Sequence, residues 1–229
     1  SLFFSTSIVQ KNKNIPLVES HRLILADTNS VPLGLAFKSP ENSFVYGTIR
    51  PLRKFNNNIY YHQSFSNGIW KVEKNNLIPF VKFKYEKNGF PDEVWKKEIS
   101  TKEFRNLKNK YLHFSGDFVI NNNINFFRFY FNNKASSFFL NKRSKNIIYG
   151  QSIIYTKNNP SMHFYRDPLS IIENNYFVSK IEPEELLFNK EYFKVCKTKN
   201  YLKSEYWEVI KNIKQADNPL IVTYKLKDF

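Results

Sequence analysis

Two short stretches combine residue types that could cleave a phosphodiester. They are His163 with Arg166 and Asp167, and His21 with Glu19 and Arg22. A ribonuclease needs a general acid, a general base and a cation beside the phosphate, and each stretch supplies all three. Because a chain this rich in lysine contains such triplets by chance, a toxin-like ribonuclease is kept as an alternative hypothesis.

The four histidines are not spaced as metal ligands. His21, His62, His113 and His163 each stand alone, and none forms the HxxxH or HExxH pattern that places two ligands on one helix face. The P-loop, GxSxG and GxGxxG motifs are absent from the sequence as well. The sequence therefore predicts no metal, no cofactor and no enzymatic activity.

A single cysteine, Cys196, leaves no partner for a disulfide within the chain. Lone cysteines are most often buried and inert. The alternative is a bridge between the Cys196 thiols of two copies, which would require the side chain to lie exposed at an interface.

The chain of 229 residues has a formal charge of +15. An excess of this size favours acidic partners such as nucleic acid. The basic groups that would face phosphates are Arg50, Arg53 and Lys54, or Lys142, Arg143 and Lys145. The excess is spread along the chain, however, and A/T-rich coding, which also explains the many Asn, Phe and Tyr residues, raises the lysine content without any ligand. No apolar run is long enough to span a membrane.

Aromatic residues make up 17% of the chain, well above ordinary usage. So many rings cannot all be buried, and aromatic side chains commonly anchor protein–protein contacts. The expected anchors are Tyr60, Tyr61, Trp70, Trp95, Tyr206 and Trp207. We therefore expect the chain to associate with other copies of itself.

Apolar runs rich in β-branched and aromatic residues predict strands through the first two-thirds of the chain. The predicted strands are Leu2–Val9, Arg22–Ala26, Phe44–Ile49, Ile59–Gln63, Ile78–Tyr85, Asn125–Phe131 and Ile147–Tyr155. One helix interrupts them, from Pro91 to about Leu107, with a break expected at Ser100–Thr101.

Helical spacing and N-terminal Asp-Pro or Glu-Pro pairs predict helices in the last third. They cover Asp167–Glu173, Glu182–Lys197 and Ser204–Gln215, and a closing strand follows at Leu220–Leu226. The expected fold class is α+β, with a strand-rich N-terminal two-thirds and a helix-rich C-terminal third. We expect a single domain over residues 1–229, with a subdivision at 1–160 and 161–229.

Two segments resemble the baculovirus polyhedrin and granulin family. His163–Asp167, followed by Ile171–Val178, is similar to the family's F-Y-R-E segment and the aromatic, acidic run after it. Tyr224–Phe229 is similar to its V-F-K-V-K-E-F segment. Together these cover about 20 residues, and the basic charge departs from the family.

The resemblance implies a structural viral protein that self-assembles into a crystal lattice, the occlusion body, and protects virions. Such a protein would be made inside the host cell, in the nucleus or cytoplasm, and would leave it within the occlusion body. Its partners would be other copies of itself and virions. The alternative to this polyhedrin-like function, besides the ribonuclease, is a basic RNA-binding component of an organellar ribosome, located in mitochondria.

Overall fold

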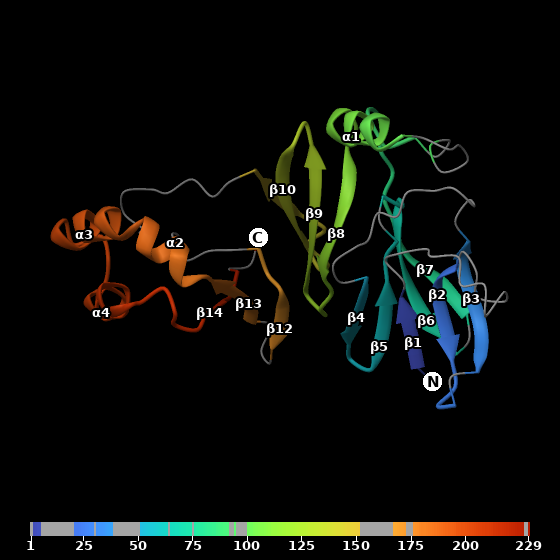
Figure 1. Ribbon diagram of the computed structural model, residues 1–229, viewed down its shortest axis with the longest axis horizontal. Coiled ribbons are helices and arrows are strands. Elements are labelled where there is room, and N and C mark those ends of the chain that lie inside the picture. Colours follow the sequence, from blue (N-terminus) through green and yellow to red (C-terminus); the bar gives the residue numbers. More distant parts are fainter. Residues whose placement is uncertain are drawn as a thin grey trace. The chain divides into compact units, whose positions relative to one another are not determined.

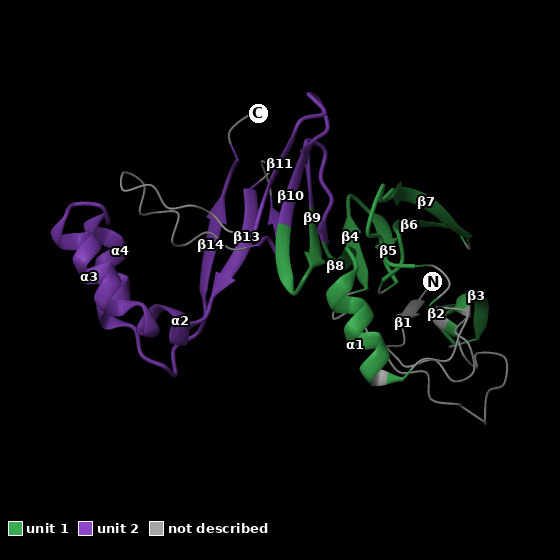
Figure 2. Ribbon diagram, turned by 90° about the horizontal axis from the view of Figure 1, so that it is seen from above, with its two compact units in different colours: residues 1–117, 127–136 green, residues 118–126, 137–229 purple. Residues whose placement is uncertain are grey.

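The structure is a computed structural model, and it describes residues 2–5, 21–29, 31–38, 51–63, 65–74, 76–91, 94, 100–151, 167–172, 176–226 and 229 (Figure 1). The chain divides into two compact units (Figure 2). Unit 1 comprises Ser1–Asp117 and Phe127–Ser136, and unit 2 comprises Phe118–Phe126 and Ser137–Phe229.

Strands dominate the described residues, and three of the four helices lie near the C-terminus (Figure 1). The strands are β1 (Leu2–Ser5), β2 (His21–Ala26), β3 (Pro32–Lys38), β4 (Leu52–Phe55), β5 (Asn58–Tyr61), β6 (Gly68–Glu73), β7 (Asn76–Lys82), β8 (His113–Val119), β9 (Ile124–Phe131), β10 (Lys134–Asn141), β11 (Ile147–Gly150), β12 (Ser170–Ile172), β13 (Tyr176–Ile181) and β14 (Leu220–Tyr224). The helices are α1 (Thr101–Lys110), α2 (Pro183–Phe188), α3 (Lys190–Thr198) and α4 (Ser204–Asn212).

These strands form four separate sheets, and in each sheet the strands lie side by side in chain order. Strands β4–β7 and β8–β11 each make a four-stranded sheet, and β1–β3 and β12–β14 each make a three-stranded sheet. The strand pairs whose residue partners the structure defines are all antiparallel. The β4–β7 and β8–β11 sheets are thus meanders of strands that follow one another in the chain, whereas α2, α3 and α4 separate β13 from β14.

Paired asparagines make two of the tight turns between neighbouring strands. Asn56 and Asn57 join β4 to β5 with φ of 45° and 60°, and Asn132 and Asn133 join β9 to β10 with φ of 50° and 60°. A two-residue hairpin turn that follows the twist of its strands needs a positive φ at both positions, which asparagine tolerates better than most residues.

Aromatic side chains fill the interior of unit 1, and aliphatic ones share it in unit 2. Phe104, on α1, and Phe114, on β8, are almost fully buried in unit 1. Unit 2 has a cluster between its strands, formed by Val119, Ile124, Phe126, Phe139 and Phe177. A second cluster lies among the helices and is formed by Ile181, Leu186, Phe193, Cys196, Leu202, Ile210 and Ile213. Burying one such side chain contributes about 1.5–3 kcal/mol.

The predicted fold class is confirmed, but one predicted helix is wrong. Instead of a helix over Asp167–Glu173, residues Ser170–Ile172 form strand β12. Ile171 pairs with Phe177 and Ile172 with Tyr176 across the antiparallel ladder to β13. The two β-branched residues pack better in this ladder than in a helix, which overrides the Asp-Pro signal.

The helix predicted over Glu182–Lys197 is divided in two. Asn189 separates α2 from α3, and its side-chain Nδ2 donates a hydrogen bond to the main-chain oxygen of Glu185 at 2.7 Å. Asparagine competes in this way for the carbonyls of a helix end. The strand predicted at Phe44–Ile49 lies outside the described residues.

Within the described part of the chain, every helix is too short or too polar to cross a lipid bilayer.

Candidate functional site

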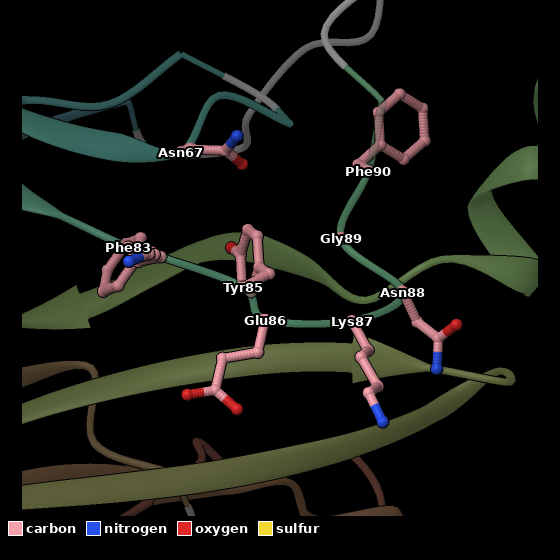
Figure 3. Close-up of a pocket in the computed structure, with 9 residues that line it drawn as sticks. Asn67, Phe83, Tyr85, Glu86, Lys87, Asn88, Gly89 and Phe90 are labelled. Carbon is pink, nitrogen blue, oxygen red and sulfur yellow. The ribbon is translucent and has the colours of Figure 1, made fainter.

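A pocket of about 320 Å³ in unit 1 is the best candidate for a binding site (Figure 3). It lies where the chain leaves β7 and runs towards α1. Its lining residues are Asn67, Phe83, Lys84, Tyr85, Glu86, Lys87, Asn88, Gly89 and Phe90.

The apolar wall of the pocket is continuous with the aromatic core of unit 1. The Phe83 ring lies 4.8 Å from that of Phe114 and 5.0 Å from that of Phe129, measured between ring centroids. The buried ring of Phe90 lies 5.2 Å from that of Phe65. Ring pairs at these separations stabilise one another, so the wall is fixed before any ligand arrives.

The turn at Asn88–Gly89 shapes the other side of the pocket. A Cβ atom at Gly89 would lie 2.7 Å from the Tyr85 Cβ, so the close approach of the chain to this ring requires glycine. The Leu112 N–H donates to the Asn88 oxygen at 2.6 Å, and the Phe90 N–H donates to the Leu112 oxygen at 3.1 Å. These two hydrogen bonds tie the turn to the start of β8.

Tyr85 contributes its ring to the pocket, while its hydroxyl is buried. Burial raises the pKa of the Tyr85 hydroxyl, and the backbone of Phe114 offsets part of this rise. Among the described residues, the hydroxyl oxygen has no partner that meets strict hydrogen-bond geometry. The phenol is therefore protonated at neutral pH, and it does not act as a base.

The polar lining combines two amides, those of Asn67 and Asn88, with charges of both signs. Lys84, Glu86 and Lys87 are exposed, and together they carry a net charge of +1. Figure 3 shows Glu86 and Lys87 directed to one side of the chain and Phe90 to the other. The lining includes no histidine, cysteine or serine, so a nucleophile paired with a base is not assembled here.

The two buried histidines of the described residues, His62 and His113, do not line this pocket. His62 Nδ1 is 2.9 Å from the main-chain oxygen of Gly68, and burial lowers the pKa of His62 to about 4. Burial also lowers the pKa of His113, whose Nδ1 lies 3.0 Å from the Tyr111 oxygen. Both rings are neutral at pH 7 and pack against aromatic rings.

Neither phosphodiester-cleaving triplet is assembled by the described residues. Glu19, His163 and Arg166 lie outside them, and so does the side chain of Arg22. His21 is half-buried on β2, and Asp167 accepts a hydrogen bond from Ser137 Oγ. No cluster of three potential metal ligands occurs in the part of the chain that is described.

The expected interface anchors differ in how exposed their side chains are. Tyr60 and Tyr61 are buried on β5, and Trp70 on β6 is half-buried with its ring 4.7 Å from that of Phe37. Trp95 lies outside the described residues. Tyr206 is exposed on α4, whereas Trp207 packs against the helical cluster of unit 2.

Cys196 is buried in the same helical cluster, with 5% of its surface exposed. A disulfide between copies would need this thiol to become accessible, so the bridge stays a prediction. Of the predicted basic groups, Arg50 lies outside the described residues and Lys54 is exposed on β4. The other group, Lys142 to Lys145, forms the turn between β10 and β11.

Comparison with known families identifies the meanders described above. The DUF5128 family of six-bladed β-propellers matches residues 3–180, more than half of the chain. The chain belongs to this family. In β-propellers each blade is a four-stranded antiparallel sheet of consecutive strands, and the β4–β7 and β8–β11 sheets have this form. Six such blades need about 24 strands, and the described residues form fewer.

A solved structure supports the same fold. The chain resembles the crystal structure of a candidate exported protein from Bacteroides fragilis, with a TM-score of 0.67 and 13% sequence identity. The similarity covers 99% of this propeller chain, which spans 62% of the length of the Bacteroides protein. No curated protein matches the sequence.

The propeller family overturns the predicted relationship to polyhedrins. The resemblance carried by His163–Asp167, Ile171–Val178 and Tyr224–Phe229 is therefore wrong, and so is the function inferred from it, an occlusion-body lattice that protects virions. Short aromatic and basic segments recur by chance in a chain with this composition, whereas the family match extends over 178 residues, 3 to 180. The expected lack of enzymatic activity, the expected partners and the expected cellular location stay predictions.

Sequence reasoning missed the pocket. Its lining comes from one continuous stretch, 83–90, and from Asn67. The Asn88–Gly89 dipeptide is a strong turn signal, and it directly follows a predicted strand. That signal could have located the turn, but only the folded chain brings Asn67 beside it.

Proposed function

We propose that this propeller chain is a non-catalytic binding protein that holds a small carboxylate-bearing molecule in the pocket beside Tyr85. The observation that carries the proposal is a packed aromatic wall in a pocket that two lysines and two asparagines also line. Ligand pockets typically combine an apolar lining with a small number of polar groups that orient the ligand.

The charges of the lining favour an anion of low charge. Lys84 and Lys87 both line the pocket, and a charge-assisted bond from an ammonium group to a carboxylate is stronger than one between neutral groups. Glu86 lies between them in the sequence and would repel a multiply charged anion such as a phosphomonoester. The formal charge of +15 attracts anions to the molecule as a whole.

The size of the pocket limits the ligand to about one ring. Its volume of about 320 Å³ is at the lower end for pockets that hold small molecules. A sugar acid suits this space, because one face of its ring is apolar enough to lie against an aromatic side chain while its hydroxyls can bond to Asn67. The export suggested for the Bacteroides relative supports a place outside the cytoplasm, where such molecules are encountered.

Calorimetric titration of the full chain with glucuronate, glutamate and glucose tests the proposal. We expect both carboxylates to bind more tightly than glucose, and their affinity to fall as salt is added. Replacing both pocket lysines, Lys84→Gln with Lys87→Gln, should weaken glucuronate binding about five- to tenfold, since each exposed charge contributes at most about 1 kcal/mol.

A matched control removes the same charge elsewhere in unit 1. Lys54 and Lys74 are exposed and do not line the pocket, so Lys54→Gln with Lys74→Gln should leave glucuronate binding unchanged. Equal losses in the two double variants would show that only overall charge matters, and the pocket assignment would then be rejected. Absence of binding to both carboxylates would reject it as well.

A further inference from the structure

Strand β11 is an edge strand with apolar side chains on both faces. It is the outermost strand of the β8–β11 sheet, and no described strand lies on its outer side. Ile147, Ile148 and Tyr149 are 56%, 48% and 72% exposed. Three consecutive large apolar residues at this exposure are unusual on a free sheet edge, because such an edge can pair with another chain.

The two edge strands of the β4–β7 sheet carry residues that discourage pairing with another chain. Strand β4 carries Arg53 and Lys54, and β7 contains Pro79 and ends at Lys82. Charged residues and proline discourage an additional strand from pairing with an edge. Strand β11, with the sequence Ile-Ile-Tyr-Gly, contains neither.

The register of the hairpin shows which main-chain groups are free to pair. The Asn141 N–H donates to the Asn146 oxygen at 2.9 Å. In an antiparallel ladder, hydrogen-bonded pairs alternate with non-bonded pairs. Since Leu140 faces Ile147 and Phe138 faces Tyr149, these two are the non-bonded pairs. The N–H and C=O groups of Ile147 and Tyr149 therefore point away from β10, towards the open edge.

The side chains of the same residues form an apolar patch on one face of the hairpin. Paired residues lie on the same face of a sheet, so Phe138, Leu140, Ile147 and Tyr149 make a continuous surface, called here the edge patch. The rings of Phe138 and Tyr149 are stacked, with centroids 5.4 Å apart and planes at 13°. An added strand would place alternate side chains against this patch.

A rigid basic turn lies at the start of the edge strand. The Asn141 side chain is buried, and its Oδ1 accepts hydrogen bonds from the main-chain N–H groups of Arg143 and Ser144 at 2.9 and 3.1 Å. Its Nδ2 donates to the Phe229 oxygen at 3.0 Å. Arg143 and Lys145 are exposed, and no carboxylate of the described residues forms an ion pair with either. The Asn141 side chain therefore holds the main chain from which these two basic side chains extend.

We propose that β11 is a docking edge for an extended acidic segment of a partner protein, which adds a fifth strand to the β8–β11 sheet. Main-chain bonds to Ile147 and Tyr149 would supply affinity, and alternate apolar side chains would rest on the edge patch, as in other strand-addition complexes. In the antiparallel direction used by the paired strands, the C-terminal end of the segment lies beside Arg143 and Lys145. The carboxylates of the partner segment belong at that end. This proposal is independent of the pocket in unit 1.

Fluorescence anisotropy with a synthetic peptide provides the test. The probe is an acetylated, fluorescein-labelled peptide of three valine–threonine repeats followed by three glutamates, and the comparison peptide carries lysines in place of the glutamates. The full chain should bind the acidic probe at least about tenfold more tightly than the basic one, since only the glutamates can form charge-assisted hydrogen bonds with Arg143 and Lys145. Added salt should reduce this difference.

Reversing the charge of the turn should change which of the two peptides binds, and unfolding cannot produce such an exchange. The double variant Arg143→Glu with Lys145→Glu should lose the acidic probe and gain the basic one. The control, Lys102→Glu with Arg105→Glu on the exposed face of α1, changes the net charge equally and should keep the wild-type preference. If both double variants lose the acidic probe to the same extent, the attraction is a property of total charge and the proposal fails.

The strand pairing itself is tested with proline. Ile147→Pro removes an N–H that points outwards, so it leaves the β10–β11 bonds in place while abolishing peptide binding. Circular dichroism checks that the variant is folded, and Tyr149→Lys, which adds a charge to the edge patch, should also abolish binding. Retained binding in both folded variants would overturn the proposal. So would sedimentation showing a dimer that Ile147→Pro abolishes, in a chain that binds no peptide.

Discussion

His62 shows how the aromatic interior constrains a single titratable residue. Its ring is fully buried, its Nε2 has no hydrogen-bond partner among the described residues, and its ring centroid lies 4.4 Å from that of Phe114. Burial depresses the pKa of His62 from 6.5 to about 4 in the folded chain. The unfolded chain therefore binds a proton at a higher pH than the folded chain, and stability must fall as the pH is lowered through this window.

We predict that this one residue removes about 3 kcal/mol of unfolding free energy between pH 7 and pH 4, because each pKa unit corresponds to about 1.4 kcal/mol. The loss begins below the unfolded value of 6.5 and is complete near 4. Urea unfolding at pH 7, 5.5 and 4.5 measures it. The variant His62→Asn keeps a donor for the Gly68 oxygen but does not titrate, so its pH dependence should be shallower. If the unfolding free energy of His62→Asn depends on pH as steeply as that of the wild type, His62 is not the source of the loss.

Element boundaries were only partly predictable, and α1 illustrates why. The predicted helix ran from Pro91 to about Leu107 with a break at Ser100–Thr101, and the structure begins α1 at Thr101 with Ser100 as its N-cap. Local chemistry explains this start, because Ser100 Oγ accepts a hydrogen bond from the Glu103 N–H at 3.1 Å. Local patterns also located β5, β7, β9 and α4 approximately.

Other elements depend on pairing that a single segment does not reveal. Strand β6 includes Gly68 and Lys71, and β10 begins Lys-Ala-Ser-Ser, so neither reads as an apolar run. Each exists because strands on both sides complete its hydrogen bonds. The same limit hid the candidate site, since Asn67 and Tyr85 meet only through the folded β6–β7 meander.

The cap of α1 can be tested directly. Ser100→Ala should lower the free energy of unfolding by about 1 kcal/mol, since it leaves the Glu103 N–H without its acceptor. Ser100→Asp, which retains an acceptor and adds a negative charge at the helix N-terminus, should be at least as stable as the wild type. Chemical denaturation followed by circular dichroism measures both variants. Equal stability of the alanine and serine forms would indicate that α1 is held by the packing of Phe104 alone.

At the scale of the whole molecule, the two units share three strands. The chain passes between units at residues 117–118, 126–127 and 136–137, and these positions lie inside β8, β9 and β10. A strand cannot lose its pairing at one end without weakening the ladder at the other. The expected single domain over 1–229 stays a prediction, and the shared strands are the feature that would couple the two units.

This sharing predicts that the two units unfold in one transition. Leu186 is buried in the helical cluster of unit 2, so Leu186→Ala should cost about 2–5 kcal/mol. In a Trp207→Phe background the remaining tryptophans, Trp70 and Trp95, belong to unit 1. When Leu186 is replaced, the urea concentration at the midpoint of unfolding should fall by the same amount whether it is followed by their fluorescence or by circular dichroism. A tryptophan midpoint that stays in place would show that the units unfold independently, with the strands of the β8–β11 sheet separating at the boundary between them.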